Sequence, residues 1–229
     1  MHTDAGGIEI LQRQIVDCRR CPRLVEHRET VARIKRRAYR DQHYWGRPVP
    51  SFGDPKARLL IIGLAPGAHG ANRTGRMFTG DRSGDFLYRA LYEAGFASQP
   101  SSEHRDDGLT LRDCYITAPV HCAPPDNQPT KDEIATCIGY LEREIALLKQ
   151  VRVVVVLGRI ALESYRAVRG LPRLDFAHGL VHETDPLLIC SYHPSQQNTQ
   201  TGRLTARMLL DVFERAGSVL DEDTASLLR

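Results

Sequence analysis

Four short apolar runs, separated by amphipathic segments, dominate the hydrophobic pattern of this chain. Three of them, at 58–63, 151–157 and 187–191, are rich in Val, Ile and Leu, and a weaker fourth spans 113–117. Uninterrupted apolar runs of this length are typical of parallel strands that are covered on both faces. The pattern therefore predicts four buried strands.

Helical periodicity fills the segments between these runs. Apolar residues recur three and four positions apart in 84–94, 132–149, 159–168 and 202–215. Strands that alternate with helices indicate βαβ units with helices on both faces of the sheet. The predicted fold class is α/β, a three-layer α/β/α sandwich around a central, mainly parallel four-stranded sheet.

The two ends of the chain give weaker signals. Residues 8–15 have a helical pattern and Pro22 suits the first turn of a second helix, so we predict an N-terminal helical segment over 6–40. The stretch 44–52 is rich in Pro and Gly and predicts a loop, and 218–229 is expected to be a loose tail. No linker divides the chain, so all 229 residues are expected to form a single domain.

Composition and charge narrow the class of protein only slightly. With 41% hydrophobic and 26% charged residues the chain has an ordinary globular composition, and its net charge of +3 says little about nucleic acid. The distribution of charge is more informative, because five cations crowd one short segment. This run could follow phosphates or simply face solvent. Its members are Arg33, Lys35, Arg36, Arg37 and Arg40.

Neither a secretory signal pattern nor a membrane span is expected. The first ten residues lack a basic segment followed by an apolar one, and no apolar stretch approaches the roughly 20 residues that cross a bilayer. We therefore expect a cytoplasmic protein, where six cysteines are more often metal ligands or core residues than disulfides.

Four of the cysteines form two pairs. Cys18 and Cys21 make a C-x-x-C motif, and Cys122 is separated from Cys137 by fourteen residues. Four thiolates suit tetrahedral zinc or a cubane iron–sulfur cluster, although the wide second spacing is less natural for zinc. Ordinary core cysteines are the alternative, and a thioredoxin-like redox pattern is absent. The remaining two fall inside predicted strands and are assigned to the core: Cys114 and Cys190.

Three unusual loops follow predicted strands, at 63–81, 121–127 and 193–195. Ligands of open parallel sheets bind outside the carboxyl ends of the strands, so we expect these loops to meet at one site. The first loop holds five glycines, which allow a close approach of the backbone to a ligand. It contains neither a P-loop nor a dinucleotide-binding fingerprint, and a purely structural loop is the alternative.

These motifs together resemble the uracil-DNA glycosylase superfamily, and in particular its family 5 (type B) branch, whose members carry an iron–sulfur cluster. The resemblance covers nearly the whole chain. It rests on Cys18-x-x-Cys21, Gly63-Leu-Ala-Pro-Gly67, Phe78-Thr-Gly-Asp81, the run from Tyr115 to Asn127, Cys137 and His193-Pro-Ser195. The resemblance implies a monomeric, monofunctional DNA glycosylase acting on damaged bases in double-stranded DNA, with a 4Fe–4S cluster on Cys18, Cys21, Cys122 and Cys137.

The same resemblance assigns roles around a flipped base. Phe78 would stack on the base, and His193 would donate a hydrogen bond as negative charge develops on it. Taken alone, His193 could equally be an ordinary turn histidine. The edge of the base would meet the backbone of the first loop together with Ala118, which precedes the second loop. The residues of the first loop are Gly63, Leu64, Ala65, Pro66 and Gly67.

Two departures from other branches of the superfamily carry consequences. Leu64 and Ala65 stand where better-known members have a polar residue that positions water, so Asp81 or Asn127 is the candidate for that role here. Either one could instead cap a helix or hold a turn. Ala118 stands where family 4 enzymes have an Asn that reads uracil, so we expect relaxed selectivity toward hypoxanthine, hydroxymethyluracil or ethenocytosine.

Several polar and cationic residues are candidates for binding DNA. Candidate DNA contacts are Arg73, Arg76, Gln196, Gln197, Asn198, Arg203 and the cationic run at 33–40. No lysine can be singled out as a Schiff-base nucleophile, which favours hydrolysis without strand cleavage.

Rival functions are a cluster-bearing DNA sensor that has lost catalysis, an enzyme that traps its product through a histidine, and a hydrolase of free nucleotides. The lesion-dependent formation of abasic DNA separates the first rival from a glycosylase.

Overall fold

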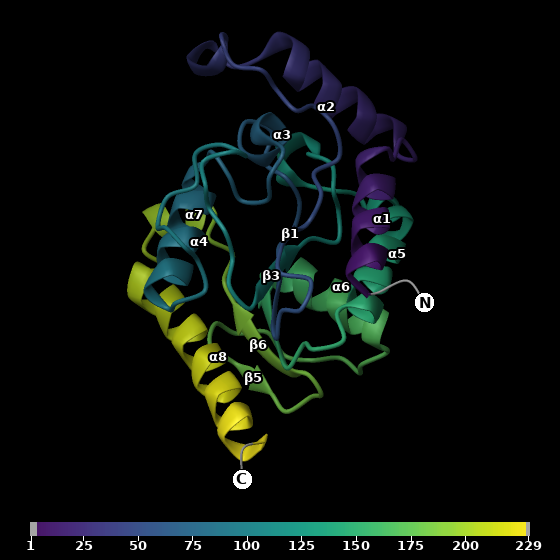
Figure 1. The fold of residues 1–229 in the computed structure, drawn as a ribbon. Helices are drawn as coiled ribbons and strands as arrows, with labels where there is room; N and C mark the ends of the chain where they lie inside the picture. Colours follow the sequence, from purple (N-terminus) through teal and green to yellow (C-terminus); the bar gives the residue numbers. More distant parts are fainter. Residues whose placement is uncertain (1–3, 228–229) are drawn as a thin grey trace.

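The computed structural model describes residues 4–227 and has three layers, with a sheet between two sets of helices (Figure 1). The strand order is β1-β3-β2-β4-β6-β5, and the four inner strands run parallel. The predicted α/β/α sandwich is therefore confirmed. The inner strands are β2 (Leu59–Ile62), β3 (Cys114–Thr117), β4 (Val153–Leu157) and β6 (Leu187–Ser191).

The sheet has six strands instead of the predicted four. Two short antiparallel strands, β1 (Phe52–Gly53) and β5 (Val181–His182), pair with β3 and β6 at the two edges. A strand of two residues carries no hydrophobic alternation that a sequence pattern could reveal. Its pairing depends on the backbone hydrogen bonds that an edge strand offers.

Alternate residues of each inner strand face opposite helical layers. Leu59 and Ile61 of β2 pack in one apolar cluster with α4 and α8, whereas Leu60 and Ile62 pack in the other with α1, α5 and α6. Figure 1 accordingly shows α4 and α8 on one side of the sheet and α1, α5 and α6 on the other. The helices are α1 (Asp4–Val16), α4 (Arg82–Glu93), α5 (Lys131–Leu147), α6 (Arg159–Arg169) and α8 (Ala206–Leu227).

The C-terminal helix differs from its prediction at both ends. It begins at Ala206, not at 202, because Gly202 adopts a left-handed φ of 71° just after the short helix α7 (Gln196–Gln200). It also continues to Leu227, so the tail predicted to be loose is helical as far as the structure describes it. The last two residues lie outside the described part of the chain.

Short helical segments surround the carboxyl ends of the strands. They are α2 (Pro22–Ile34), η1 (Arg37–Tyr39), α3 (Ala71–Thr74) and η2 (Pro125–Asn127). Strand β2 lies between β3 and β4, so the direction of the crossovers reverses beside it, and this is where an open parallel sheet forms a ligand crevice. Within residues 4–227, no helix is long and apolar enough to cross a membrane.

Candidate functional site

A cleft of about 830 Å³ opens at the carboxyl ends of the parallel strands. The loops after β2, β3 and β6 all contribute to its walls, as the strand topology predicted. Residues 36 and 38–39, from the segment after α2, complete the rim. The predicted residues that the structure brings together here are Leu64, Ala65, Pro66, Gly67, Phe78, Asp81, Ala118, Asn127, His193 and Gln196.

The aromatic ring of Phe78 forms one wall of this cleft. It lies so close to Gly63 that a Cβ atom at that position would sit 2.8 Å from its Cε2 atom. The ring centroids of Phe78 and His193 are 5.8 Å apart, with planes inclined by 32°. The cleft therefore presents a flat apolar face beside a ring whose nitrogens can form hydrogen bonds.

Phe78 is held in an unusual backbone conformation. Its φ of 50° lies in the left-handed region, which is strained for a bulky residue. The hydroxyl of Ser102 donates to the Phe78 carbonyl at 3.3 Å, and the hydroxyl of Tyr88 donates to the Met77 carbonyl at 2.8 Å. Only glycine fits at position 84, because a Cβ atom there would lie 1.8 Å from the Phe78 oxygen. The strained turn is thus fixed by its surroundings.

Arg76 lies beneath this turn and is buried. Its guanidinium forms two hydrogen bonds to Asp107, at 2.8 and 2.7 Å, and its Nε atom donates to the Thr79 hydroxyl at 2.9 Å. Although burial alone would raise the pKa of Asp107, the Arg76 guanidinium holds that pKa well below its usual range. Arg76 therefore supports the turn that carries Phe78, and this geometry argues against the predicted phosphate contact.

Arg73 is also buried and also has partners within the protein. Its guanidinium donates to the His69 carbonyl at 2.7 Å and to the Gly80 carbonyl at 2.6 Å, and it lies 4.0 Å from the centre of the Tyr39 ring. A further hydrogen bond goes to the side chain of Gln42. Arg73 thereby joins the two ends of the glycine-rich loop to the segment after α2, and three of the five N–H donors of its guanidinium are bonded within the protein.

Asp81 caps α4, which was the alternative to a role in positioning water. Its Oδ1 atom accepts a hydrogen bond of 3.0 Å from the Gly84 amide. Its Oδ2 atom is directed toward the glycine-rich loop, where a Cβ atom at Gly70 would lie 1.8 Å away. Burial raises the pKa of Asp81. One carboxylate oxygen thus lies at the cleft wall, and a role in positioning water remains a prediction.

His193 enters the cleft as a neutral imidazole. Burial lowers its pKa to about 4, so the ring carries no charge near neutral pH. The Asn198 side-chain amide donates to the His193 carbonyl at 2.9 Å and holds the backbone in place. Within residues 4–227, no hydrogen bond to the imidazole itself is found, so its nitrogens are available to a ligand.

The remaining predicted residues lie around the rim. Asn127 is exposed at the end of η2 with a left-handed φ of 56°, and Gln196 is exposed at the start of α7. Arg203 stacks over Tyr192 at 4.6 Å from the ring centre. Ala118 is buried in the cleft floor. Asn127 and Gln196 can reach a ligand in the cleft, whereas Asn198 acts through the backbone of the histidine loop.

Sequence reasoning missed His69, which also lines the cleft. Its Nδ1 atom is 2.9 Å from the hydroxyl of Tyr44. Burial, followed by the charges of Arg36 and Arg73, lowers the pKa of His69. The position of His69 in the glycine-rich loop was a signal that it could lie at the site. Its partner Tyr44 lies in a segment that the sequence predicted only as a loop.

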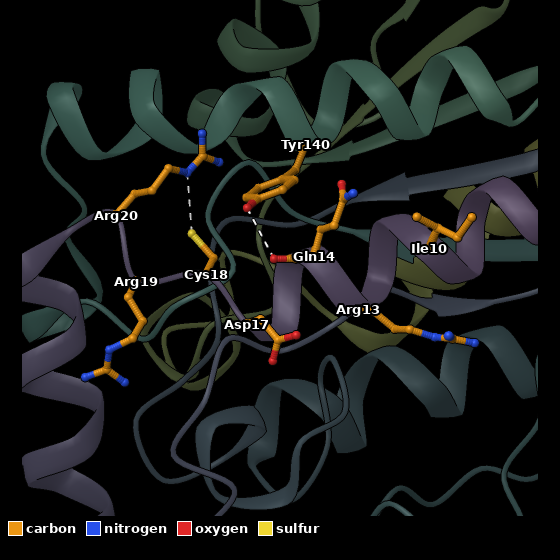
Figure 2. Close-up of a pocket in the computed structure, with 8 residues that line it drawn as sticks. All are labelled: Ile10, Arg13, Gln14, Asp17, Cys18, Arg19, Arg20 and Tyr140. Atoms are coloured by element: carbon orange, nitrogen blue, oxygen red, sulfur yellow. Dashed lines mark hydrogen bonds between the residues drawn. The ribbon is translucent and has the colours of Figure 1, made fainter.

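The four predicted cysteine ligands line one small apolar cavity away from the cleft. Cys18 follows α1, Cys21 precedes α2, Cys122 lies in the loop after β3 and Cys137 lies within α5. Cys18 is half-buried at the edge: Figure 2 shows the Arg20 guanidinium beside its sulfur, at 3.5 Å, and Tyr140 donating to the Gln14 carbonyl. None of the six cysteines forms a disulfide, and Cys114 and Cys190 are buried in their strands as predicted.

The surroundings of this cavity are compatible with an iron–sulfur cluster. A tetrahedral zinc ion needs sulfur ligands about 3.8 Å apart, since each Zn–S bond is about 2.3 Å. Within residues 4–227, no three His, Cys, Asp or Glu side chains lie close enough to hold one ion. The thiolates of a cubane cluster bind different irons and stand farther apart.

Buried nitrogens beside the cavity are also compatible with an iron–sulfur cluster. Arg28 is buried and donates to the Cys122 sulfur at 3.1 Å, while its Nε atom has no partner. His121 bonds to the Val49 carbonyl through Nδ1, but its Nε2 atom, also buried, has none. A buried guanidinium offsets the negative charge of thiolates, and its unpaired N–H suits a sulfide acceptor.

The fold and the site define a class of protein. It comprises α/β proteins with a parallel sheet and a cleft at the strand ends, walled by an aromatic ring and a neutral histidine. The family model for the uracil DNA glycosylase superfamily matches residues 50–216, and the chain belongs to that superfamily. Curated relatives named type-5 uracil-DNA glycosylase match nearly the whole chain, which confirms the predicted resemblance to family 5.

Three of these relatives come from distant organisms. The protein from Thermus thermophilus is 54% identical over 91% of this chain and 96% of its own length. The protein from Mycobacterium leprae is 53% identical over 93% of this chain and 95% of its own length. The protein from Pyrobaculum aerophilum is 44% identical over 95% of this chain and 96% of its own length.

Proposed function

We propose that this protein is a monofunctional DNA glycosylase that removes uracil from double-stranded DNA by hydrolysing the N-glycosidic bond, and that it acts as a monomer in base excision repair. The observation that carries the proposal is the cleft in which Phe78, His193 and the loop of residues 64–67 meet. A base inside a duplex cannot reach such a cleft, so the nucleotide must leave the stack. Supporting this, the type-5 relatives are named for uracil in DNA.

The residues of the cleft divide the reaction between them. The half-buried Phe78 ring stacks on the flipped base, and the backbone of residues 64–67 meets its edge. As the glycosidic bond breaks, the bonding electrons pass to the base, which becomes an anion. The neutral imidazole of His193 donates a hydrogen bond to that anion through its one N–H group.

Water completes the reaction by adding its oxygen to the anomeric carbon and losing a proton. Leu64 and Ala65 cannot orient that water, since neither side chain has a polar atom. The two candidates are the Oδ2 atom of the half-buried Asp81 and the exposed amide of Asn127, both on the cleft wall. Asp81 is already fixed by its cap bond to Gly84, so it offers a preorganised acceptor. No lysine lines the cleft in residues 4–227, which accords with hydrolysis without strand cleavage.

The cysteine site is proposed to hold a 4Fe–4S cluster on Cys18, Cys21, Cys122 and Cys137. Bound there, the cluster would serve as a structural clasp. Burial raises the pKa of Cys122 to about 11 and that of Cys137 to about 12, so both thiols lose a proton on ligation. Thiolate ligation of this kind requires a reducing compartment, which accords with the expected cytoplasmic, nucleoid-associated location.

Relaxed base selectivity is the finer part of this proposal. The cleft floor at Ala118 is a buried methyl group with no polar atom to read uracil. Hypoxanthine, hydroxymethyluracil and ethenocytosine should therefore also be excised. The rival function, a damage sensor without catalysis, is motivated only by the apolar Leu64 and Ala65, and the neutral His193 in the cleft speaks against it.

End-labelled duplexes test the activity. Anaerobically purified protein is incubated with duplexes that carry U·G, hypoxanthine·T or no lesion, and each is then treated with alkali. Breaks at the lesion that depend on alkali are expected for the first two duplexes and not for the third. Tight binding without any break would reject the glycosylase in favour of the sensor.

Elemental analysis tests the cysteine site. About four irons per chain with a brown colour are expected, and Cys137→Ala should lose both. Cys190→Ala is the matched control, since Cys190 is buried in β6 away from the cavity. One zinc per chain would overturn the cluster assignment.

A further inference from the structure

The segment of residues 33–43, here called the arm, carries an unusual concentration of unneutralised charge. Five of its side chains are cationic against one carboxylate, Asp41, and none of the five forms an ion pair in the described part of the chain. Arginines elsewhere are commonly paired, as Arg19 is with Glu29 and Arg58 is with Asp113. Arg33, Arg36, Arg37 and Arg40 are exposed, whereas Lys35 is half-buried. Such a surface suits a polyanion.

The arm borders the cleft. Figure 1 shows α2 and the chain after it lying over the end of the molecule that carries α3. Arg36 and Tyr39 of the arm line the same cleft as Phe78 and His193. A polyanion that follows the arm would therefore pass directly beside a base held in the cleft.

Buried contacts fix the arm relative to the cleft. The Arg73 guanidinium lies over the Tyr39 ring and bonds the Gln42 side chain, while its other donors hold the carbonyls of His69 and Gly80. The pair formed by Tyr44 and His69 lies at the base of the arm. The arm is thus preorganised, and a ligand that it binds loses little free energy in ordering it.

The chain turns sharply where the arm begins. Lys35, at the end of α2, has a left-handed φ of 58°, and Ile34 just before it is 72% exposed. An exposed apolar side chain flanked by cations suits the edge of a nucleic-acid groove, where phosphates alternate with apolar sugar faces.

We propose that the arm grips the sugar–phosphate backbone of duplex DNA beside the flipped nucleotide, and that buried Arg73 sets its distance from the cleft. This inference rests on the proposed function, which makes DNA the substrate. Each cation that neutralises a phosphate releases a condensed counterion, so the arm contributes affinity that depends strongly on salt and little on base sequence.

The test compares two triple variants of equal charge. The arm variant is R36Q/R37Q/R40Q, and the control is R143Q/R152Q/R215Q, whose exposed arginines lie in α5, before β4 and in α8, away from the cleft. Dissociation constants are measured from 50 to 300 mM salt on a duplex with a stable abasic analogue. This duplex cannot be cleaved, so the result does not depend on whether the protein excises bases.

The arm variant should bind at least about tenfold more weakly at 100 mM salt, and the slope of log K against log salt should fall by about 2–3, as expected for the loss of up to three phosphate contacts. The control variant should keep nearly the wild-type slope. Equal behaviour of the two variants would overturn the proposal, because only net charge would then matter.

Hydrogen exchange provides a second measurement on the unmodified protein. Amides of residues 33–43 should gain protection when the uncleavable duplex is added, to an extent comparable with the amides of the cleft loop 63–81. Protection of the cleft loop without any change in the arm would contradict the proposal, even if the triple variants proved difficult to fold.

Discussion

The arginines of the glycine-rich loop and those of the arm differ in what their guanidinium groups contact. Arg73 and Arg76 are buried and bond to carbonyls, hydroxyls or a carboxylate of the protein itself. Arg36, Arg37 and Arg40 are exposed and have no carboxylate partner among residues 4–227. The two groups meet where Arg73 lies over Tyr39, a residue of the arm that lines the cleft.

This difference separates arginines that support the structure from arginines that can bind a ligand. Glycine and arginine together in a loop suggested phosphate binding, yet the buried arginines hold the strained turn at Phe78 and the base of the arm. A buried guanidinium must satisfy its donors locally, whereas an exposed one keeps them for a ligand. Variants of the two groups should therefore differ in kind: those of the glycine-rich loop should affect stability and rate, and those of the arm should affect affinity for DNA.

The largest effect is expected for Arg76→Met. The substitution leaves Asp107 buried without its partner, which should lower the free energy of unfolding by about 3–5 kcal/mol. Arg37→Met, on the exposed side, should change it by no more than about 0.5 kcal/mol. Urea unfolding measures both, and similar losses in the two variants would remove the distinction between buried and exposed arginines.

His193→Leu should follow. Loss of a donor to the departing base is expected to reduce the single-turnover rate about 10²- to 10³-fold, while binding of an abasic duplex stays nearly unchanged. Asn198→Ala, which frees the His193 carbonyl, should give a smaller loss of rate in the same direction. A rate for His193→Leu within a factor of two of the wild type would exclude His193 from the reaction.

Phe78→Ala tests the aromatic wall. Stacking on a base is worth about 1–3 kcal/mol, so the rate should fall by roughly 5- to 150-fold. Phe78→Tyr retains the ring and should stay close to the wild-type rate. If alanine and tyrosine were equally active, the ring would not touch the base.

The smallest effect concerns pH. Because burial raises the pKa of Asp81, its carboxylate protonates at a higher pH than an ordinary aspartate, and the rate should decline on the acid side as that proton is taken up. His193, with a pKa of about 4, is neutral above that pH. Asp81→Asn should be slower and lose this decline, whereas Asn127→Ala should keep it. If neither variant changes the rate, both assignments to water are wrong.

Much of the fold followed from the sequence. The four inner strands gave uninterrupted apolar runs because both of their faces are covered, as they are at Leu59–Ile62. The edge strands at Phe52 and Val181 did not, since two residues are too few to carry a pattern. The helix after Ala206 was expected to stop early, although residues such as Leu220 pack in the apolar core.

The sequence predicted which residues lie at the site better than it predicted what each of them does there. Strand topology alone brought the loops of Phe78, Asn127 and His193 to one cleft. It could not reveal that Asp107, in a polar connector, would pair with Arg76, since a partner 31 positions away leaves no local signal. The same holds for His69, whose partner Tyr44 comes from a loop without periodicity.

A single-turnover titration of a U·G duplex tests the division of roles between the glycine-rich loop and the arm most directly. For each variant it gives the maximal rate of base release and the protein concentration at half of that rate. Phe78→Ala should lower the maximal rate with little change in the half-saturating concentration, and R36Q/R37Q/R40Q should raise the half-saturating concentration with the maximal rate nearly unchanged. The reverse pattern, or no release of uracil by the wild-type protein, would contradict this account.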